Sequence, residues 1–379
     1  MAVGLRRDAD LGRTSPATLT IDLGALAANW HLLRDQAAPA ECAGVVKADA
    51  YGLGIEPVMR ALWRAGCRTF FVAHPGEAHL ALAAQPDAVV YVLNGLLPGA
   101  TSEYRTSAMR PVLGSVEEIR DWAAFCAGAG RRLPAALHVD TGMNRLGLSR
   151  AELSALAAAD LLARFEPTLL MSHLVSAEDP ADPVTTRQVA VFSEFGTALP
   201  GIPASLCNSS GLFLGAPPVH ALVRPGYALY GGNPTPGRPN PMRPVVRLEA
   251  GIVQVREIGP GERVGYNGRW TAPTYRRVAT LSVGYADGYL RAAGGPDGAV
   301  CRGAALVGAV LCPVLGTVSM DLLVIDVTDA PHELAKRGGV ATLIGDELDV
   351  DAVGRRAGTI GYEILTALGS RYERRYVDG

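Results

Sequence analysis

Short apolar runs alternate with amphipathic stretches over roughly the first two-thirds of the chain. The runs end at eight positions, namely Lys47, Ala73, Asn94, Leu113, Asp140, His173, Asn208 and Arg224. Helical periodicity separates them, as in residues 55–65, 116–127, 150–159 and 185–198. Buried parallel strands read as continuous apolar runs, and their alternation with helices is typical of a parallel sheet. Eight such units predict an α/β fold of the (β/α)8 TIM-type barrel class, with catalytic groups at the strand ends.

An open, doubly wound sheet is the alternative that this pattern leaves open. No G-x-G-x-x-G follows the first expected strand, which disfavours dinucleotide binding. Residues 233–244 (NPTPGRPNPMRP) have the composition of a linker, and β-branched runs separated by glycine follow it. We therefore expect a tail over residues 1–16, a barrel over 17–237 and a mostly-β C-terminal domain over 238–379. The run at residues 17–21 is expected to pair with that second domain.

Composition narrows the class of protein further. The 379 residues are 49% hydrophobic and 19% charged, which excludes intrinsic disorder, and the net charge of −2 indicates neither nucleic acid nor a membrane as partner. No run approaches the roughly 20 apolar residues of a membrane span, and the N-terminus has no apolar signal core. Six scattered cysteines and seven isolated histidines predict reduced thiols and no metal site. We expect a soluble, cytoplasmic protein.

Lys47 is the first candidate for chemistry, because it directly follows two valines at the end of the first strand. Partial desolvation there would lower the pKa of its amine and make it available for a Schiff base. The plain alternative is a lysine that reaches solvent at a strand end. Arg145 follows the fifth strand and can present a planar fork to a carboxylate or phenolate.

Three further strand ends hold polar residues. His173 ends the sixth strand, where it is as compatible with a core histidine as with a functional one. Small and hydroxyl-bearing residues follow the seventh and eighth strands, as is usual for the phosphate cradle of such barrels. In the β domain, Tyr285 and the Met320–Asp321 pair interrupt apolar strands. A tyrosine in such a turn is usually a packing residue, but beside a cationic cofactor its phenol could act as a base.

Six motifs occur together in a characteristic order: VKADAYG at residues 46–52, VDTGMNRL at 139–146, RPG at 224–226, GYADG at 284–288, SMD at 319–321 and GYE at 361–363. On these motifs the chain resembles the alanine racemases over about residues 17–376. The resemblance implies a pyridoxal phosphate enzyme with a barrel and a C-terminal β domain, an isomerase that works as a head-to-tail homodimer on a small amino acid.

The resemblance also implies roles for particular residues. Lys47 matches the lysine that holds the cofactor and exchanges protons on one face, and Tyr285 of the partner subunit matches the base on the other. Arg224 matches the arginine at the pyridine nitrogen, and His173 its hydrogen-bonding neighbour. Because arginine does not give up its proton, the ring stays a weak electron sink, which favours racemisation over transamination.

Substrate and phosphate contacts are implied in the same way. Arg145 is similar to the residue that reaches the cofactor phenolate and the substrate carboxylate, with the Met320 backbone N–H and Asp321 nearby. The phosphate region is matched by Tyr51, Asn208, Ser209, Gly226, Tyr227 and Tyr362.

Two positions depart from the family pattern. His138 stands where many members have a lysine that is modified by carbon dioxide and positions the arginine, so either a bound anion or a histidine hydrogen bond could hold Arg145. Leu53 replaces a histidine, with little expected consequence for the chemistry.

Alternatives to an alanine racemase are a racemase of another small amino acid such as serine, a non-catalytic pyridoxal phosphate carrier and a decarboxylase. Arg224 argues against the decarboxylase, and Tyr285 with Met320–Asp321 would have no role in the carrier. The sequence leaves open a biosynthetic or a catabolic role.

Overall fold

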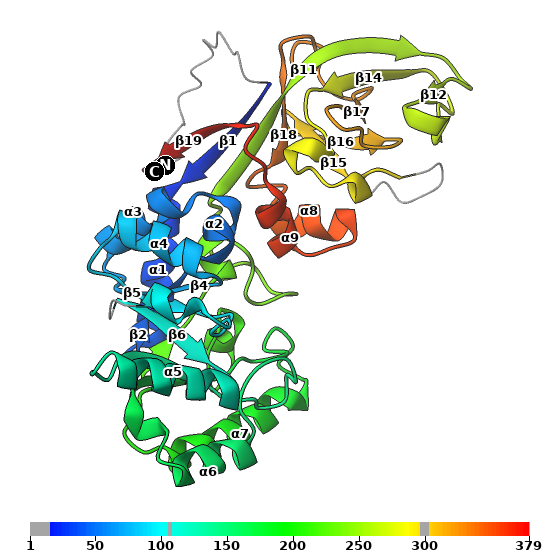
Figure 1. Cartoon of the computed structure of the whole chain (residues 1–379). Helices are drawn as coiled ribbons and strands as arrows, with labels where there is room; N and C mark the ends of the chain where they lie inside the picture. The colour runs from blue at the N-terminus through cyan, green and yellow to red at the C-terminus, as the bar shows by residue number, and fades with distance from the viewer. Residues whose placement is uncertain (1–15, 105–107, 296–302, 379) are drawn as a thin grey trace. The chain divides into compact units, whose positions relative to one another are not determined.

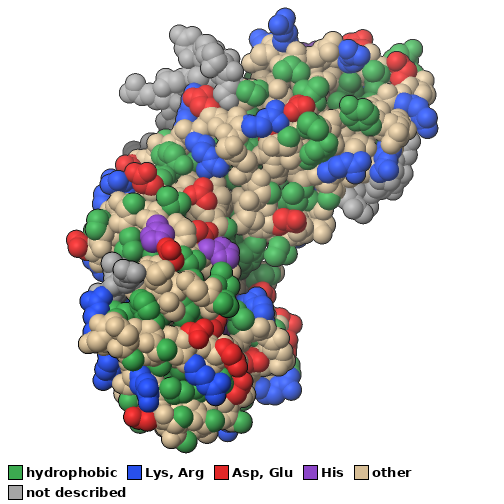
Figure 2. Space-filling model, viewed as in Figure 1, with side chains coloured by type: hydrophobic (Ala, Val, Ile, Leu, Met, Phe, Trp, Pro, Cys, Tyr) green, Lys and Arg blue, Asp and Glu red, His purple; other side chains and the backbone are tan. Residues whose placement is uncertain are grey.

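The computed structural model describes residues 16–104, 108–295 and 303–378, so residues 1–15 of the expected tail lie outside the described part. The chain divides into two compact units (Figure 1). The barrel unit contains residues 22–245 and 376–378, and the β unit contains residues 16–21 and 246–375. No helix among the described residues is long and apolar enough to cross a membrane. On the visible face of each unit, basic and acidic side chains are interspersed (Figure 2).

The strands of the barrel unit run parallel to one another. They are β2 (Glu41–Cys42), β3 (Gly44–Val45), β4 (Thr69–Val72), β5 (Val89–Val92), β6 (Met109–Leu113), β7 (Pro134–His138), β8 (Glu166–Met171), β9 (Ala204–Ser205) and β10 (Leu222–Val223). Strands β3 to β9 pair in chain order, and β10 pairs with β2. The backbone nitrogen of Arg224 donates to Cys207 O at 2.9 Å, and that of Ala43 to Val223 O at 3.0 Å. These bonds close the ring, so the predicted barrel is confirmed and the open sheet is excluded.

Helices of the barrel unit begin and end at residues suited to those positions. They are α1 (Leu23–Ala37), α2 (Lys47–Gly52), α3 (Ile55–Ala65), α4 (Pro75–Ala84), α5 (Val116–Gly128), α6 (Arg150–Ala158) and α7 (Pro183–Ala198). Ser115 and Ser149 form capping boxes at α5 and α6, and Gly66 ends α3 with φ of +114°. The four predicted helical segments are confirmed as α3, α5, α6 and α7.

Antiparallel strands form the β unit, as predicted. They are β1 (Ala17–Asp22), β11 (Val246–Ile258), β12 (Arg263–Val264), β13 (Trp270–Thr271), β14 (Arg276–Leu281), β15 (Ala304–Val307), β16 (Val310–Leu315), β17 (Leu323–Asp326), β18 (Val340–Ile344) and β19 (Glu373–Val377). The main sheet has the order β14-β17-β16-β15-β18-β11-β1-β19. Ala17 is opposite Ala250 in the β1–β11 register, which confirms the expected pairing of residues 17–21 with this domain.

The units divide the chain at positions that differ from the expected boundaries. Strand β1 belongs with the β unit because it pairs with β11. The Pro- and Gly-rich segment packs with the barrel unit, where Asn29 Oδ1 accepts from Arg243 N at 2.7 Å and Asn29 Nδ2 donates to Arg243 O at 2.9 Å. The linker-like segment is therefore the last part of the main stretch of the barrel unit, which ends at residue 245.

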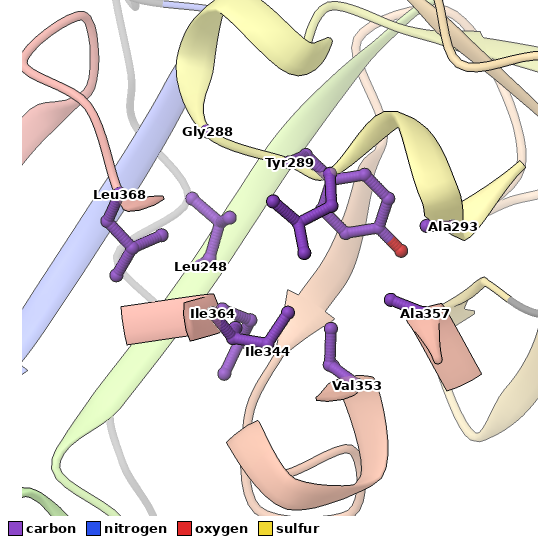
Figure 3. Close-up of a pocket in the computed structure, with 10 residues that line it drawn as sticks. Leu248, Gly288, Tyr289, Ala293, Ile344, Val353, Ala357, Ile364 and Leu368 are labelled. Atoms are coloured by element: carbon purple, nitrogen blue, oxygen red, sulfur yellow. The ribbon is translucent and has the colours of Figure 1, made fainter. Parts of the chain in front are cut away.

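Helices α8 (Val350–Ala357) and α9 (Gly361–Ala367) pack beside the sheet of the β unit around a small apolar cavity (Figure 3). Leu248 of β11, Ile344 of β18 and Val353 of α8 are among its lining residues. The cavity has a volume of about 10 Å³, at the limit for a single water molecule. It is therefore a packing feature of this core.

Candidate active site

Lys47 lies at the end of β3, after the buried Val45 and Val46, and its side chain is half-buried. Burial lowers the pKa of its amine, the nearby Arg145 lowers it further, and Glu77 acts in the opposite direction. This is the desolvated lysine that its sequence position predicts. A lowered pKa increases the fraction of free amine, which is the nucleophilic form.

The turn after Lys47 has an unusual backbone. Ala48, Asp49, Ala50 and Tyr51 all have φ between 53° and 56°, in the left-handed region. This conformation costs roughly 1–2 kcal/mol for each residue that has a side chain. Hydrogen bonds and packing compensate, since Asp49 Oδ1 accepts from Ile55 N at 2.8 Å and the Tyr51 ring stacks on Tyr230 at 4.5 Å between centroids. The backbone around Lys47 is thereby fixed.

Glu77, in the first turn of α4, contacts the turn after Lys47, a contact that the sequence did not predict. Its Oε1 accepts from Ala48 N at 2.6 Å, and its Oε2 accepts from Ala73 N at 2.7 Å and His74 N at 3.2 Å. The sequence indication is ordinary, a glutamate at the third position of a helix that begins with proline. One carboxylate thus joins the end of β4 to the turn that holds Lys47.

Arg224 is a buried cation at the end of β10. It donates to Ser205 Oγ through Nη1 and to the carbonyl oxygen of Ser172 through Nη2. Burial lowers the pKa of its guanidinium to about 10, so it stays charged near neutral pH. In the described part of the chain none of the ion pairs includes it. A buried donor of this kind suits a ligand atom that accepts a hydrogen bond without carrying a proton.

His173 follows Ser172 at the end of β8. Burial, then the charges of Arg224, Lys47 and Arg145, lower the pKa of its imidazole to about 3. The ring is therefore neutral at physiological pH, and these three cations belong to one electrostatic environment. The Arg224 hydrogen bond goes to the carbonyl oxygen of Ser172 rather than to the ring of the expected neighbour, His173.

Gln188 of α7 connects the strand ends around His173. Its Nε2 donates to Thr141 Oγ1 at 3.0 Å and to His173 O at 2.9 Å, and its Oε1 accepts from Val175 N at 2.9 Å. The side chain is fully buried. A single glutamine in an otherwise ordinary helix gave no indication of this role.

Arg145 lies in a turn that Asp140 organises. Asp140 Oδ1 accepts from the backbone nitrogens of Gly142 and Met143, both at 2.9 Å, and of Asn144 at 3.2 Å. Leu148 N donates to His138 O at 2.9 Å and closes the loop. The carboxylate of Asp140 therefore fixes the backbone from which the exposed Arg145 side chain extends.

His138, at the position of the family lysine, is a neutral residue. Burial and the neighbouring Arg224 lower the pKa of its imidazole to about 4. The neutral imidazole adds no charge near Arg145 at physiological pH.

The turns after β9 and β10 meet through Ser209. Its Oγ accepts from Gly226 N at 3.1 Å and from Ala228 N at 3.2 Å, which leaves the hydroxyl proton to donate outward. Asn208 Oδ1 accepts from Gly211 N at 2.9 Å.

The turn at Gly226 passes close to Tyr51. A Cβ at Gly226 would overlap the hydroxyl group of Tyr51, so only glycine fits this approach. The neighbouring Tyr227 is buried beside Gly232. Hydroxyl and N–H donors concentrated here suit a phosphate.

Candidate residues of the β unit gather on two adjoining loops. The 3₁₀ turn Tyr285–Asp287 begins with Tyr285 N donating to Ser319 O at 3.0 Å, and Ala286 N donates to Met320 O at 3.0 Å. The side chains of Tyr285, Met320 and Asp321 are exposed. Tyr362 is exposed at the start of α9. The structure thus brings Tyr285, Met320 and Asp321 together on adjoining loops of the β unit, while Tyr362 lies on a separate helix of that unit.

Comparison with known proteins identifies the family. Residues 21–234 match the N-terminal domain of alanine racemases, and residues 245–376 match the C-terminal domain. The chain belongs to the alanine racemase family. The alanine racemase of Methylobacterium sp. (strain 4-46) is 65% identical over 96% of this chain and 99% of its own length, and that of Methylobacterium nodulans is 62% identical over 96% of each.

Among solved structures, the alanine racemase from Bartonella henselae with covalently bound pyridoxal phosphate has a TM-score of 0.90 at 38% identity and covers 96% of this chain and all of its own. The biosynthetic alanine racemase from Pseudomonas aeruginosa has a TM-score of 0.85 at 32% identity, over 96% of this chain and all of its own. The resemblance drawn from the six motifs is confirmed, and so is the fold of alanine racemases for both units.

Proposed function

We propose that this chain interconverts L- and D-alanine with pyridoxal 5′-phosphate, using Lys47 and Tyr285 as two opposing bases. The observation that carries the proposal is the lowered pKa of Lys47 in a barrel whose neighbouring strand ends hold a buried Arg224 and a donor-rich turn. An amine, a partner for the ring nitrogen and a phosphate cradle are the contacts by which proteins hold this cofactor, and here the buried Arg224 is the partner for the ring nitrogen.

The residues present fit the cofactor. Lys47 Nζ would hold it covalently, Arg224 would meet the pyridine nitrogen, and the Ser209 hydroxyl with the backbone of the turns at Asn208 and Gly226 would hold the phosphate. Tyr51, Tyr227 and Tyr362 would complete the phosphate region, as the resemblance to the family implies. When bound, the cofactor supplies an electron sink that makes the α-proton of an amino acid removable.

The protein controls how quickly the α-carbon regains a proton. Arg224 keeps its own proton, since its pKa stays near 10, and so it accepts none from solvent to pass to the ring. The weaker sink favours immediate return of a proton to the α-carbon. Neutral His173 adds no charge beside Arg224. Arg145 and the Met320 N–H, with Asp321 nearby, would orient the substrate carboxylate.

Inversion at carbon needs one base on each face. Lys47 would exchange the proton on one face, and Tyr285 of the partner subunit on the other, in a head-to-tail homodimer. This assembly explains why the candidate bases lie in different units of the chain. The partners are thus the amino-acid substrate and a second copy of the chain.

A cytoplasmic location fits the thiols. The cysteines Cys42, Cys67, Cys126, Cys207 and Cys312 are free and buried, whereas Cys301 lies outside the described residues. Free thiols are characteristic of reducing compartments.

An assay of the purified protein with L-alanine tests the proposal. We expect optical rotation to fall to zero without release of carbon dioxide, because the two enantiomers have equal free energy. Release of carbon dioxide would identify a decarboxylase instead, and unchanged optical rotation with bound cofactor a carrier. A parallel assay with L-serine decides between the two racemase substrates.

A further inference from the structure

Arg371 of the β unit connects the two loops on which the candidate residues of that unit lie. Its Nε is 3.1 Å from Asp287 Oδ1, and its Nη2 is 2.9 Å from Asp321 Oδ1. Asp287 is two residues after Tyr285, and Asp321 directly follows Met320. One guanidinium therefore joins the loop of the candidate base to the loop of the candidate carboxylate site.

The two carboxylates differ in how much they depend on this arginine. Asp287 is 4% exposed, and its Oδ2 accepts from Gly284 N at 2.8 Å. A buried carboxylate is costly unless it is both hydrogen-bonded and paired with a cation, and Arg371 supplies that charge. Asp321 is exposed. Its hydrogen bond to Arg371 and the negative charge of Asp287 both raise the pKa of the Arg371 guanidinium. The arginine therefore stays charged.

Backbone contacts show that the loops act as one element. Tyr285 N and Ala286 N donate across to Ser319 O and Met320 O, and a Cβ at Gly284 would overlap those same two carbonyl groups. Gly369 N, two residues before Arg371, donates to Asp287 O at 3.0 Å. Three segments that are distant in sequence are thus joined around one ion-pair cluster.

We propose that Arg371 is a positioning residue for the racemase reaction, which fixes Tyr285 relative to the backbone of Met320. The proposal rests on the proposed function, in which Tyr285 is a base and Met320 binds the substrate carboxylate. The planar guanidinium can bond two carboxylates through different nitrogens at once, whereas a lysine ammonium is a single point charge. This fork adds to the backbone hydrogen bonds that hold the two loops together.

Hydrogen–deuterium exchange of the cofactor-loaded, full-length protein tests the structural part. In Arg371→Gln we expect faster exchange in the peptides that contain residues 284–288 and 318–322, with unchanged exchange around residues 44–53. Arg371→Lys should show a smaller increase in the same peptides, and it serves as the test variant if Arg371→Gln does not fold. Arg375→Gln is the matched control, because Arg375 pairs only locally with Glu373 at 2.7 Å. Wild-type exchange in both loops of Arg371→Gln or Arg371→Lys would overturn the proposal.

Isotope effects test the positioning role itself. We expect kcat/KM to fall roughly tenfold in Arg371→Gln, with partial rescue in Arg371→Lys. With alanine deuterated at the α-carbon, the isotope effect should rise for the enantiomer from which Tyr285 removes the proton and fall towards one for the other. A general loss of folding or cofactor would lower the rate but leave both isotope effects at their wild-type values, and that result would contradict the proposal. If the wild type does not racemise alanine, the proposed function fails by itself, while the exchange experiment still decides whether Arg371 joins the loops.

Discussion

Glu77 Oε1 accepts a hydrogen bond from the backbone nitrogen of Ala48, the residue directly after Lys47, at 2.6 Å. The same carboxylate raises the pKa of Lys47 against the larger effects of burial and Arg145. It therefore has two separable effects, one on the strained turn and one on the protonation of the amine.

Replacing Glu77 with Gln removes the charge and keeps one acceptor oxygen. The pKa of Lys47 should fall further, because the only contribution that raises it is lost. Arg145→Gln should raise that pKa, because a cation is removed. The measurement removes the cofactor with hydroxylamine and then follows, as a function of pH, the rate at which an amine-reactive reagent modifies Lys47. We also expect Glu77→Gln to lower the free energy of unfolding by about 2 kcal/mol, since three N–H groups share this carboxylate.

Glu103→Gln is the matched control, because Glu103 pairs with His79 on the surface. Equal pH profiles for wild type and Glu77→Gln would show that the carboxylate has no effect on the amine.

Strand ends were predictable because a buried parallel strand needs an unbroken apolar run, and the first polar residue marks where it leaves the core. Lys47, His173 and Arg224 lie at such ends. The second domain was predictable from its glycine-separated β-branched runs. The residues that position these groups were not, since Glu77 resembles an ordinary helix cap and Ser205 an ordinary strand residue.

The left-handed turn at residues 48–51 was likewise not predictable from the sequence. Alanine and tyrosine disfavour positive φ, and aspartate adopts it only occasionally and as a single residue, so tertiary contacts impose the run of four. Arg371 lies near the C-terminus and bonds to residues 84 and 50 positions earlier in the chain. Local sequence patterns do not contain that information.

Lys47 should be the residue that holds the cofactor. Purified protein should be yellow, and borohydride reduction should attach the pyridoxyl group to the peptide that contains Lys47. Lys336 is the internal control, because it is the other lysine in the chain. Mass spectrometry of the digested protein locates the label, and its presence on Lys336 would refute the assignment.

Arg224→Glu should change the ratio of products rather than only the rate. A glutamic acid can give a proton to the ring nitrogen, which strengthens the electron sink and lengthens the interval before the α-carbon regains a proton. We expect more pyruvate per D-alanine formed, measured by coupled assays in a folded, cofactor-loaded variant. An unchanged ratio would mean that Arg224 does not control the sink.

His138 should make stability fall as the pH is lowered. Its pKa is lowered to about 4 in the folded protein against about 6.5 in the unfolded chain, so the unfolded state binds more protons between these values. The free energy of unfolding should therefore decrease as pH falls through that range. At pH 5 this single residue costs on the order of 2 kcal/mol relative to pH 7.

Denaturation at pH 7 and pH 5 measures this effect. The decrease should be smaller in His138→Gln than in the wild type, and His332→Gln, at an exposed position, should behave like the wild type. If His138→Gln loses as much stability as the wild type, the histidine is not neutral in the folded protein.

Mixed dimers should show that each site is shared between two chains. Lys47→Ala and Tyr285→Ala homodimers should each be nearly inactive, because every site lacks one base. After subunit exchange a mixed dimer has one site without either base and one with both, since a two-fold dimer has two equivalent composite sites. Random mixing of equal amounts makes about half of the dimers mixed, so roughly a quarter of wild-type sites should return. A site within one chain could not be rescued, because each chain keeps its own lesion. Mass spectrometry that detects mixed dimers while activity stays at the parental level would therefore exclude the shared site.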